Sequence, residues 1–368
     1  MTKRHIFEVD ERGLADLMMR KENKDWIVYE LWQNAVDTGA TEVFFDIRAT
    51  DRRGYTLIRV TDNDPDGFKD LSHAYTLFAP SIKKRDPTKR GRFNLGEKLV
   101  LALCDNASVI STTGSVHFGS EGRWNGMVKR ARGTEFTGDV RMNKGERESA
   151  INALHNLIVP NGVTLIVNGE PVLVREPIGS IEKVALDTVI TNDDGALVRS
   201  RRQTTVTLYE PIDGVGWLYE GGIPICEVGD RYDVNVDQKV PLTLERDSVP
   251  AKFLRELRAA VLNATSGTLD AQEASSTWVL DAIESPTITT EAVADVHRAR
   301  FGDKSFIARP GDTEGTQEML GQGYVQVPAA TYSKRAWEAV RESGVVTIAP
   351  KSAQSKVRDH MLNGVPNP

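Results

Sequence analysis

Cysteine is almost absent from this sequence. Among its 368 residues only Cys104 and Cys226 are present, too few for a disulfide framework or a cysteine-based zinc site. A pair of thiols without partners is typical of core positions in a reducing compartment. We therefore expect a cytoplasmic protein.

Long hydrophobic runs are also missing. No apolar stretch approaches the roughly 18 residues that a membrane-spanning helix needs. The first part of the chain mixes charges with short apolar patches and lacks the apolar core and small-residue cleavage site of a secretory signal. The sequence predicts neither export nor a membrane partner.

Metal-binding histidine patterns and a strongly basic character are missing as well. The six histidines show no metal-site spacing. The net charge of −6 argues against a wholly basic nucleic-acid binder, although it leaves room for a local basic surface. Binding to DNA stays an open alternative.

The sequence does contain a regular mixture of helical and strand patterns. With 40% hydrophobic and 27% charged residues, its composition is that of a globular protein. Strand-like alternation and amphipathic helical spacing succeed one another along the first half of the chain. Strands are expected at 41–47, 55–61, 107–112, 115–118, 134–136 and 163–167, and helices within 11–38, 95–104 and 146–157. This pattern predicts an α+β sandwich with helices on one face of a mixed sheet.

Changes in pattern divide the chain into three predicted domains. The first is the α+β sandwich over residues 1–176. The second, residues 177–268, carries strands near 204–208, 215–219 and 232–236 and a closing helix near 252–262. The third, residues 269–368, is predicted to be mainly helical, with helices near 271–283, 290–301 and 333–342.

Three motifs in the first domain carry the chemistry. Glu30, Asn34 and Asp37 are spaced i, i+4 and i+7, so they project from one helix face, a pattern that taken alone is more often a solvated polar face. The strand from 55 onward runs into Asp62-Asn63 and then Gly67, where a simple turn is the alternative interpretation. The segment 91–99 places glycines before a helix, a site at which free backbone N–H groups favour phosphate.

In this order the motifs resemble the nucleotide-binding boxes of the GHKL ATPase family, which comprises gyrase, Hsp90, histidine kinases and MutL. Residues 30–37, with the sequence Glu-Leu-Trp-Gln-Asn-Ala-Val-Asp, match the first box, Asp62-Asn63 with Gly67 the second, and residues 91–96 the third. The pair Gly133-Thr134 is similar to a glycine-threonine pair before a late strand of that domain. The resemblance implies a Bergerat-type sandwich that binds ATP and Mg²⁺. The layout is most similar to the N-terminal halves of MutL, the topoisomerase VI B subunit and MORC proteins.

The resemblance also implies a role for each residue. Glu30 would be the general base toward the attacking water, and Asn34 would give its amide oxygen to Mg²⁺. Asp62 would accept from the exocyclic amino group of adenine, supported by other polar side chains. The full set of implied ligand-binding residues is Asn34, Asp37, Asp62, Asn63, Gly67, Gly91, Leu95, Gly96, Glu97, Lys98 and Thr134.

The second box departs from the family pattern. In the family a glycine directly follows the Asp-Asn pair, whereas here residues 64–66, with the sequence Asp-Pro-Asp, separate the pair from Gly67. The turn is therefore longer and more acidic, which changes the expected adenine pocket without removing Asp62.

The second predicted domain is similar to the transducer domain of the family, which has a ribosomal S5-like fold. The stretch 232–239 resembles the MutL segment that ends in a phosphate-contacting lysine, here Lys239, and 240–247 resembles the Hsp90 segment that carries a catalytic arginine, here Arg246. Either cation would neutralise charge on the γ-phosphate.

Three functions fit these expectations. The first is an ATP hydrolase whose cycle drives homodimerisation in a DNA-transaction or remodelling process. The second is an Hsp90-like chaperone with a protein client. The third is a nucleotide-gated scaffold that binds ATP without turning it over.

Overall fold

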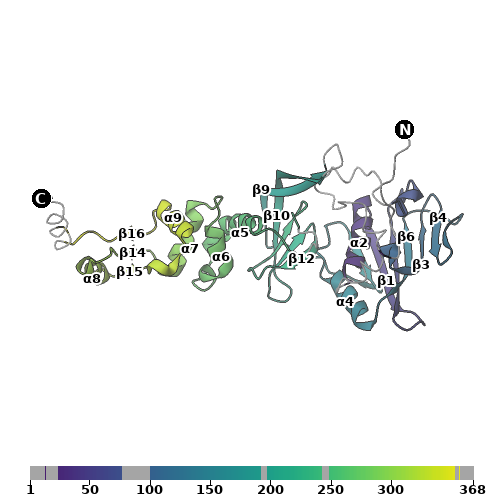
Figure 1. Cartoon of the computed structure of the whole chain (residues 1–368), viewed down its shortest axis with the longest axis horizontal. Helices are drawn as coiled ribbons and strands as arrows, with labels where there is room; N and C mark the ends of the chain where they lie inside the picture. Colours follow the sequence, from purple (N-terminus) through teal and green to yellow (C-terminus); the bar gives the residue numbers. More distant parts are fainter. Residues whose placement is uncertain are drawn as a thin grey trace. The chain divides into compact units, whose positions relative to one another are not determined.

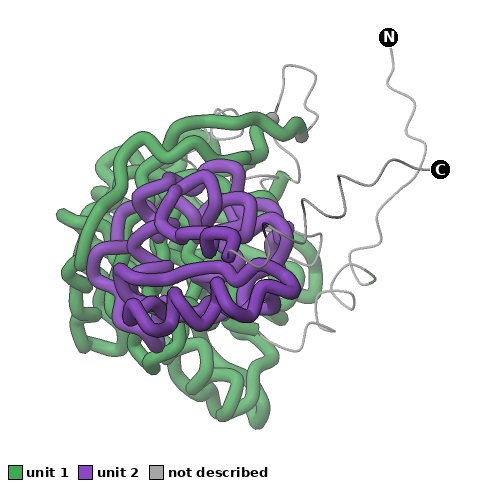
Figure 2. Tube along the Cα trace, turned by 90° about the vertical axis from the view of Figure 1, so that its left-hand side faces the viewer, with its two compact units in different colours: residues 1–241 green, residues 242–368 purple. Residues whose placement is uncertain are grey.

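The computed structural model describes residues 13, 24–76, 100–191, 197–242, 248–352 and 356, without the side chains of Thr191 and Leu197. The chain forms two compact units, residues 1–241 and 242–368, which are coloured separately in Figure 2. The first unit holds two sheets (Figure 1). The predicted α+β class is confirmed.

The first sheet has eight strands in the order β5-β4-β3-β6-β2-β1-β7-β8. Their bounds are β1 Glu42–Ala49, β2 Tyr55–Asp62, β3 Cys104–Ile110, β4 Ser115–Gly119, β5 Gly122–Gly126, β6 Glu135–Arg141, β7 Thr164–Val167 and β8 Glu170–Pro171. All pairs are antiparallel except β1 with β7, so the sheet is mixed, as predicted.

Two helices pack on the first sheet because each has one apolar stripe. Helix α2, Trp26–Thr38, buries Ile27, Leu31 and Ala35 at near-helical spacing. Helix α4, Lys144–His155, begins with a capping box in which Asn143 and Glu146 satisfy each other's backbone N–H groups. Both helices contact β1, and they lie on the same side of the sheet in Figure 1.

The second sheet has five strands in the order β12-β11-β13-β10-β9. Its strands are β9 Gly179–Thr191, β10 Leu197–Tyr209, β11 Trp217–Glu220, β12 Ile223–Glu227 and β13 Asp233–Val236. The backbone N–H of Ile158, which follows α4, donates to the Gly222 carbonyl at 2.9 Å. Ile223 belongs to the core of the first sheet. The two sheets of this unit are therefore packed together.

The second unit contains helices and a small sheet. Its elements are α5 Ala251–Thr265, η3 Ser266–Thr268, η4 Glu273–Ser275, α6 Thr277–Ile283, α7 Thr290–Phe301, β14 Ser305–Ile307, α8 Thr313–Gly321, β15 Val325–Gln326, η5 Ala329–Thr331, α9 Lys334–Glu342 and β16 Thr347–Ile348. The three strands are parallel in the order β15-β14-β16. This sheet was absent from the sequence prediction, because strands of two or three residues leave no readable alternation.

The boundary between the compact units follows residue 241, so residues 177–241 of the second predicted domain share a unit with the first predicted domain, whereas α5 belongs to the C-terminal unit. The three-domain division stays a prediction. Within the described residues, no helix is long and apolar enough to cross a membrane.

Candidate functional site

One edge of the first sheet gathers the polar residues that the motifs single out. Asp62 ends β2, Thr134 directly precedes β6, and Ser111 directly follows β3. The registers Thr61↔Glu135 and Ile110↔Glu135 bring these three ends together. Residues far apart in the sequence thereby form one cluster.

The Asp62 carboxylate is held by backbone N–H groups through one oxygen. Its Oδ1 accepts from Asp64 N at 2.9 Å and from Thr134 N at 3.2 Å. Its Oδ2 has no hydrogen-bond partner among the described residues. Burial raises the pKa of Asp62 above its usual value and the nearby Asp64 adds to this, while the two N–H bonds and Arg130 oppose it. The arrangement leaves one fixed acceptor oxygen for a ligand.

Gly133 allows the close approach that builds this cluster. It has φ +75°, and a Cβ there would lie 1.9 Å from the Asp62 carbonyl oxygen. Asp62 N donates to Thr134 O at 3.0 Å, and Gly133 N donates to Asp64 O at 2.7 Å. The predicted Gly133-Thr134 pair therefore lies directly against the predicted adenine-reading carboxylate.

Gly67 also allows a close contact, in this case between the turn that follows Asp62 and the end of β3. It has φ +59°, and a Cβ there would lie 2.4 Å from Ser111 Oγ. The next residue, Phe68, donates its N–H to Ser111 Oγ at 2.6 Å. The sequence motifs did not indicate Ser111, because a serine at a strand end has no signature of its own. Only the pairing of β3 with β6 reveals its place.

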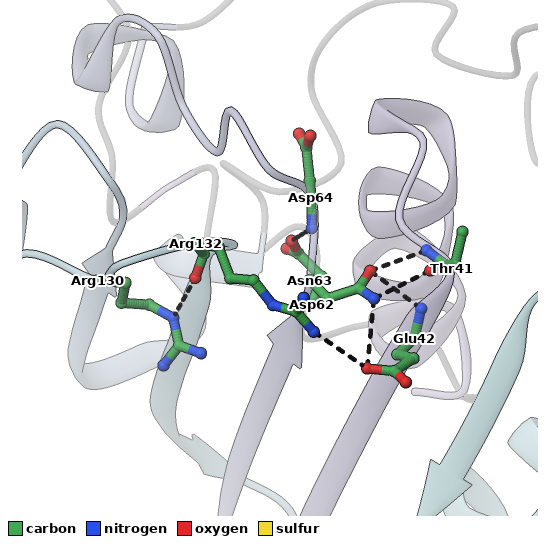
Figure 3. Close-up of polar contacts among 7 residues, drawn as sticks. All are labelled: Thr41, Glu42, Asp62, Asn63, Asp64, Arg130 and Arg132. Carbon is green, nitrogen blue, oxygen red and sulfur yellow. Dashed lines mark hydrogen bonds and ion pairs between the residues drawn. The ribbon is translucent and has the colours of Figure 1, made fainter.

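Asn63 is turned toward the start of β1 (Figure 3). Its Oδ1 accepts from the backbone N–H groups of Thr41 and Glu42 at 2.9 and 3.1 Å, and its Nδ2 donates to Thr41 Oγ1 at 2.9 Å. Through these bonds the Asn63 side chain joins the end of β2 to the segment that connects α2 with β1. The geometry favours a structural role for the Asn63 side chain over a direct ligand contact.

The three polar residues of α2 are partly buried. The helix ends at Thr38, and Gly39 with a φ of 99° turns the chain toward Thr41 and β1, so the helix end lies beside the Asp62–Asn63 turn. The Nδ2 of Asn34 is enclosed and has no hydrogen-bond partner among the described residues. An enclosed amide without an internal partner is a candidate ligand group.

Two arginines flank the cluster on the segment before Gly133 (Figure 3). Arg130 Nη1 contacts Glu135 Oε2 at 3.1 Å, and Arg130 Nε donates to the Arg132 carbonyl at 3.2 Å. Arg132 reaches Glu42 Oε2 at 3.4 Å. Their charges are therefore partly neutralised by carboxylates of the same sheet.

Several predicted site residues lie outside the described residues: Gly91, Leu95, Gly96, Glu97, Lys98 and Arg246. Lys239 is described, and its side chain is only 1% exposed. It follows β13, and its carbonyl accepts from Thr188 Oγ1 at 2.7 Å. In this arrangement the Lys239 ammonium is not presented on the surface of the unit.

Within the described ranges, no three histidine, cysteine, aspartate or glutamate residues gather as a metal site. The predicted Mg²⁺ ligand is a single amide, Asn34. Mg²⁺ bound to a nucleotide usually takes few protein ligands, because phosphate oxygens and water complete its coordination.

The chain is similar in structure to two solved forms of the ATPase region of topoisomerase II from Saccharomyces cerevisiae. The form bound to ICRF-187 (dexrazoxane) is 12% identical, with 55% of this chain and 62% of that chain covered and a TM-score of 0.34. The second form is 11% identical, with 54% and 61% covered and a TM-score of 0.35. The chain thus spans less than two thirds of those regions. No protein-family model matches the sequence, and no curated protein matches it.

At these values the structural likeness carries no argument about ligand or activity.

Proposed function

We propose that the first unit binds ATP at the sheet edge formed by Asp62, Thr134 and the end of α2, and hydrolyses it as a GHKL-type ATPase. The observation that carries the proposal is the Asp62 carboxylate, which is fixed through Oδ1 and leaves Oδ2 as an acceptor. An exocyclic amino group of a purine is a suitable donor for such an oxygen.

The residues of α2 supply the phosphate end of the proposed site. The enclosed amide of Asn34 fits a Mg²⁺ ligand, because no internal bond among the described residues fixes its orientation and its oxygen can face the ion. When bound, Mg²⁺ would neutralise charge on the phosphates. Glu30, one turn earlier on the same helix face, would orient and deprotonate the attacking water.

Asp37 and Thr134 would support base recognition, and Lys239 or Arg246 would neutralise the γ-phosphate. For Lys239 this requires leaving the buried position described above. The proposal therefore assigns Lys239 to a later, closed arrangement rather than to the preformed site.

The decisive experiment measures ATP binding by calorimetry and phosphate release on the full chain. Glu30→Ala should bind ATP within about threefold of the wild type and lose essentially all turnover, because its carboxylate acts on water. Asp62→Asn should weaken ATP binding by about tenfold or more, since the amide adds a donor where an acceptor is needed. Asp46→Asn, at a half-buried aspartate on β1, is the matched control and should change neither quantity.

Full turnover by Glu30→Ala would remove its catalytic role. Tight binding by Asp62→Asn would place base recognition elsewhere. ATP binding without turnover in the wild type would favour the nucleotide-gated scaffold. Stimulation by DNA would support a DNA-transaction role, and stimulation by unfolded protein would support a chaperone.

A further inference from the structure

The turn that follows Asp62 is held by three consecutive hydroxyl residues at the end of β3. Ser111 Oγ accepts from Phe68 N at 2.6 Å, and Thr113 Oγ1 donates to Phe68 O at 2.6 Å. Thr112 Oγ1 donates to the Asp66 carbonyl. The longer acidic turn, which departs from the family pattern, is thus anchored to the neighbouring strand.

Of these three residues, only Ser111 also reaches the site. Its Oγ lies 3.2 Å from Thr134 Oγ1, and its side chain is completely buried. Its backbone is fixed on both sides, because Ser111 N donates to Gly114 O and Ser111 O accepts from Arg130 N. The hydroxyl therefore occupies a defined position between the turn and Thr134.

The distance alone allows either hydroxyl to donate, but the other hydrogen bond of Ser111 favours one direction. Ser111 Oγ already accepts the Phe68 N–H, and its own proton needs an acceptor because buried hydroxyl groups are almost always satisfied. Among the described residues the acceptor within reach is Thr134 Oγ1. By this argument Ser111 donates to Thr134, which leaves the proton of Thr134 to point into the site.

This direction gives the site an ordered pair of polar groups. Asp62 Oδ2 is an acceptor, and the adjacent Thr134 hydroxyl is a donor. Adenine presents a complementary order, with an amino donor at position 6 and an acceptor nitrogen at position 1. Guanine presents the reverse order at the same two positions. A fixed donor at Thr134 therefore favours adenine over guanine.

We propose that Ser111 is a positioning residue that fixes the direction of the Thr134 hydroxyl and thereby sets the preference for adenine over guanine nucleotides. The proposal rests on the proposed nucleotide site. Without the Ser111 proton, Thr134 Oγ1 can accept as well as donate, so the guanine N1–H becomes tolerated.

The test compares ADP and GDP affinities of the full chain by calorimetry. The wild type should prefer ADP, and Ser111→Ala should lower the ADP-to-GDP affinity ratio by roughly three- to tenfold, the size of one hydrogen bond. Ser115→Ala removes another completely buried serine, one that contacts His117 instead, and should leave the ratio unchanged. Thermal unfolding checks that each variant is folded.

A double-mutant cycle separates positioning from simple destabilisation. Thr134→Val should lower the ratio by a similar factor, and adding Ser111→Ala to it should change the ratio no further. If Ser111→Ala does not fold, Ser111→Cys keeps a weaker donor and should shift the ratio in the same direction by less.

Equal weakening of ADP and GDP by Ser111→Ala, or additive effects on the ratio in the cycle, would overturn the positioning role while leaving the nucleotide site intact. A wild-type protein that binds neither nucleotide would remove the nucleotide site itself, and this role with it.

Discussion

At the scale of single residues, the site depends on glycines that admit close backbone contacts. Gly133 and Gly54 have almost the same dihedral angle, φ +75° and +79°. They differ in their surroundings, since a Cβ at Gly133 meets the Asp62 carbonyl and a Cβ at Gly54 meets nothing within 4 Å. Alanine substitutions at the two glycines therefore separate the energetic cost of the positive φ from the cost of the steric contact with Asp62.

Gly54→Ala should lower the free energy of unfolding by about 1 kcal/mol, the cost of a left-handed alanine. Gly133→Ala should lower it by roughly 2–5 kcal/mol, because displacement of the β2 end adds to that cost. Only Gly133→Ala should weaken ATP binding. Urea unfolding and calorimetry measure both effects, and equal losses in the two variants would show that the contact with Asp62 has little energetic weight.

At the scale of elements, regular alternation made most of the first sheet predictable. In β1 the buried residues Val43, Phe45 and Ile47 alternate with more exposed ones, as the sequence indicated. Strand β9 was missed because its alternation is interrupted. Ile181 and Val184 pair with Val206 and Thr204, so a bulge at Lys183, φ 59°, shifts the period by one residue.

Strand β8 was also missed, although a signal for it was present. Asn168 and Gly169 have φ values of 52° and 87°, the conformation of a two-residue hairpin turn for which Asn-Gly is the preferred sequence. The site residues likewise divide into those that a local sequence signal indicates and those that it does not. Asp62 and Thr134 follow from ordered motifs, whereas Ser111 depends on a strand pairing that local sequence does not encode.

Helix α7 in the second unit carries a buried histidine with a defined pH effect. His297 is completely buried, with Nε2 2.8 Å from Ser305 Oγ and Nδ1 3.1 Å from Tyr332 Oη. Burial, and to a lesser extent Arg300, lowers the pKa of His297 from 6.5 to about 4. The folded unit therefore holds His297 neutral at pH values where the unfolded chain is protonated.

The stability that His297 contributes should be complete above pH 6.5 and should be lost as the pH falls toward about 4. The loss should reach about 3 kcal/mol. Hydrogen exchange of α7, corrected for the intrinsic rate at each pH, measures it. His297→Gln should flatten the pH dependence, and the exposed His155→Gln should not. An unchanged slope in His297→Gln would assign the acid sensitivity to other groups.

At the scale of the whole molecule, the segment that links the two sheets of the first unit is anchored to the second sheet by polar contacts. Arg175 lies in the segment between β8 and β9. Its guanidinium binds the buried Asp233 of β13 at 2.7 Å and Tyr219 Oη of β11 at 3.3 Å. Tyr29 of α2 is partly buried, and its pKa is raised by this burial, then by Asp25 and Tyr219. The helix that carries Glu30 thus lies within electrostatic range of Tyr219 of the second sheet.

This proximity motivates the last prediction, that ATP drives homodimerisation and that Lys239 acts in the closed state. The proposed centre has Glu30 and Asn34 on α2 and Lys239 beyond β13, where its side chain is buried. Because the side chain is buried, we expect a rearrangement to precede any contact of that ammonium with a γ-phosphate. A contact between Lys239 and the γ-phosphate exists only with ATP, so its free energy favours the closed state only while ATP is bound. Hydrolysis should therefore return the protein to the open state.

Light scattering of the full chain should show a doubled mass with a non-hydrolysable ATP analogue and a single mass with ADP. Lys239→Ala should slow turnover by about tenfold or more and leave ADP affinity within about threefold, because the contact exists only with the γ-phosphate. Lys24→Ala is the matched control, since Lys24 is also a buried lysine and binds Glu146 at 2.8 Å, and its turnover per folded molecule should be unchanged. A mass that no nucleotide changes, together with normal turnover in Lys239→Ala, would leave an ATPase that works as a single chain without this lysine.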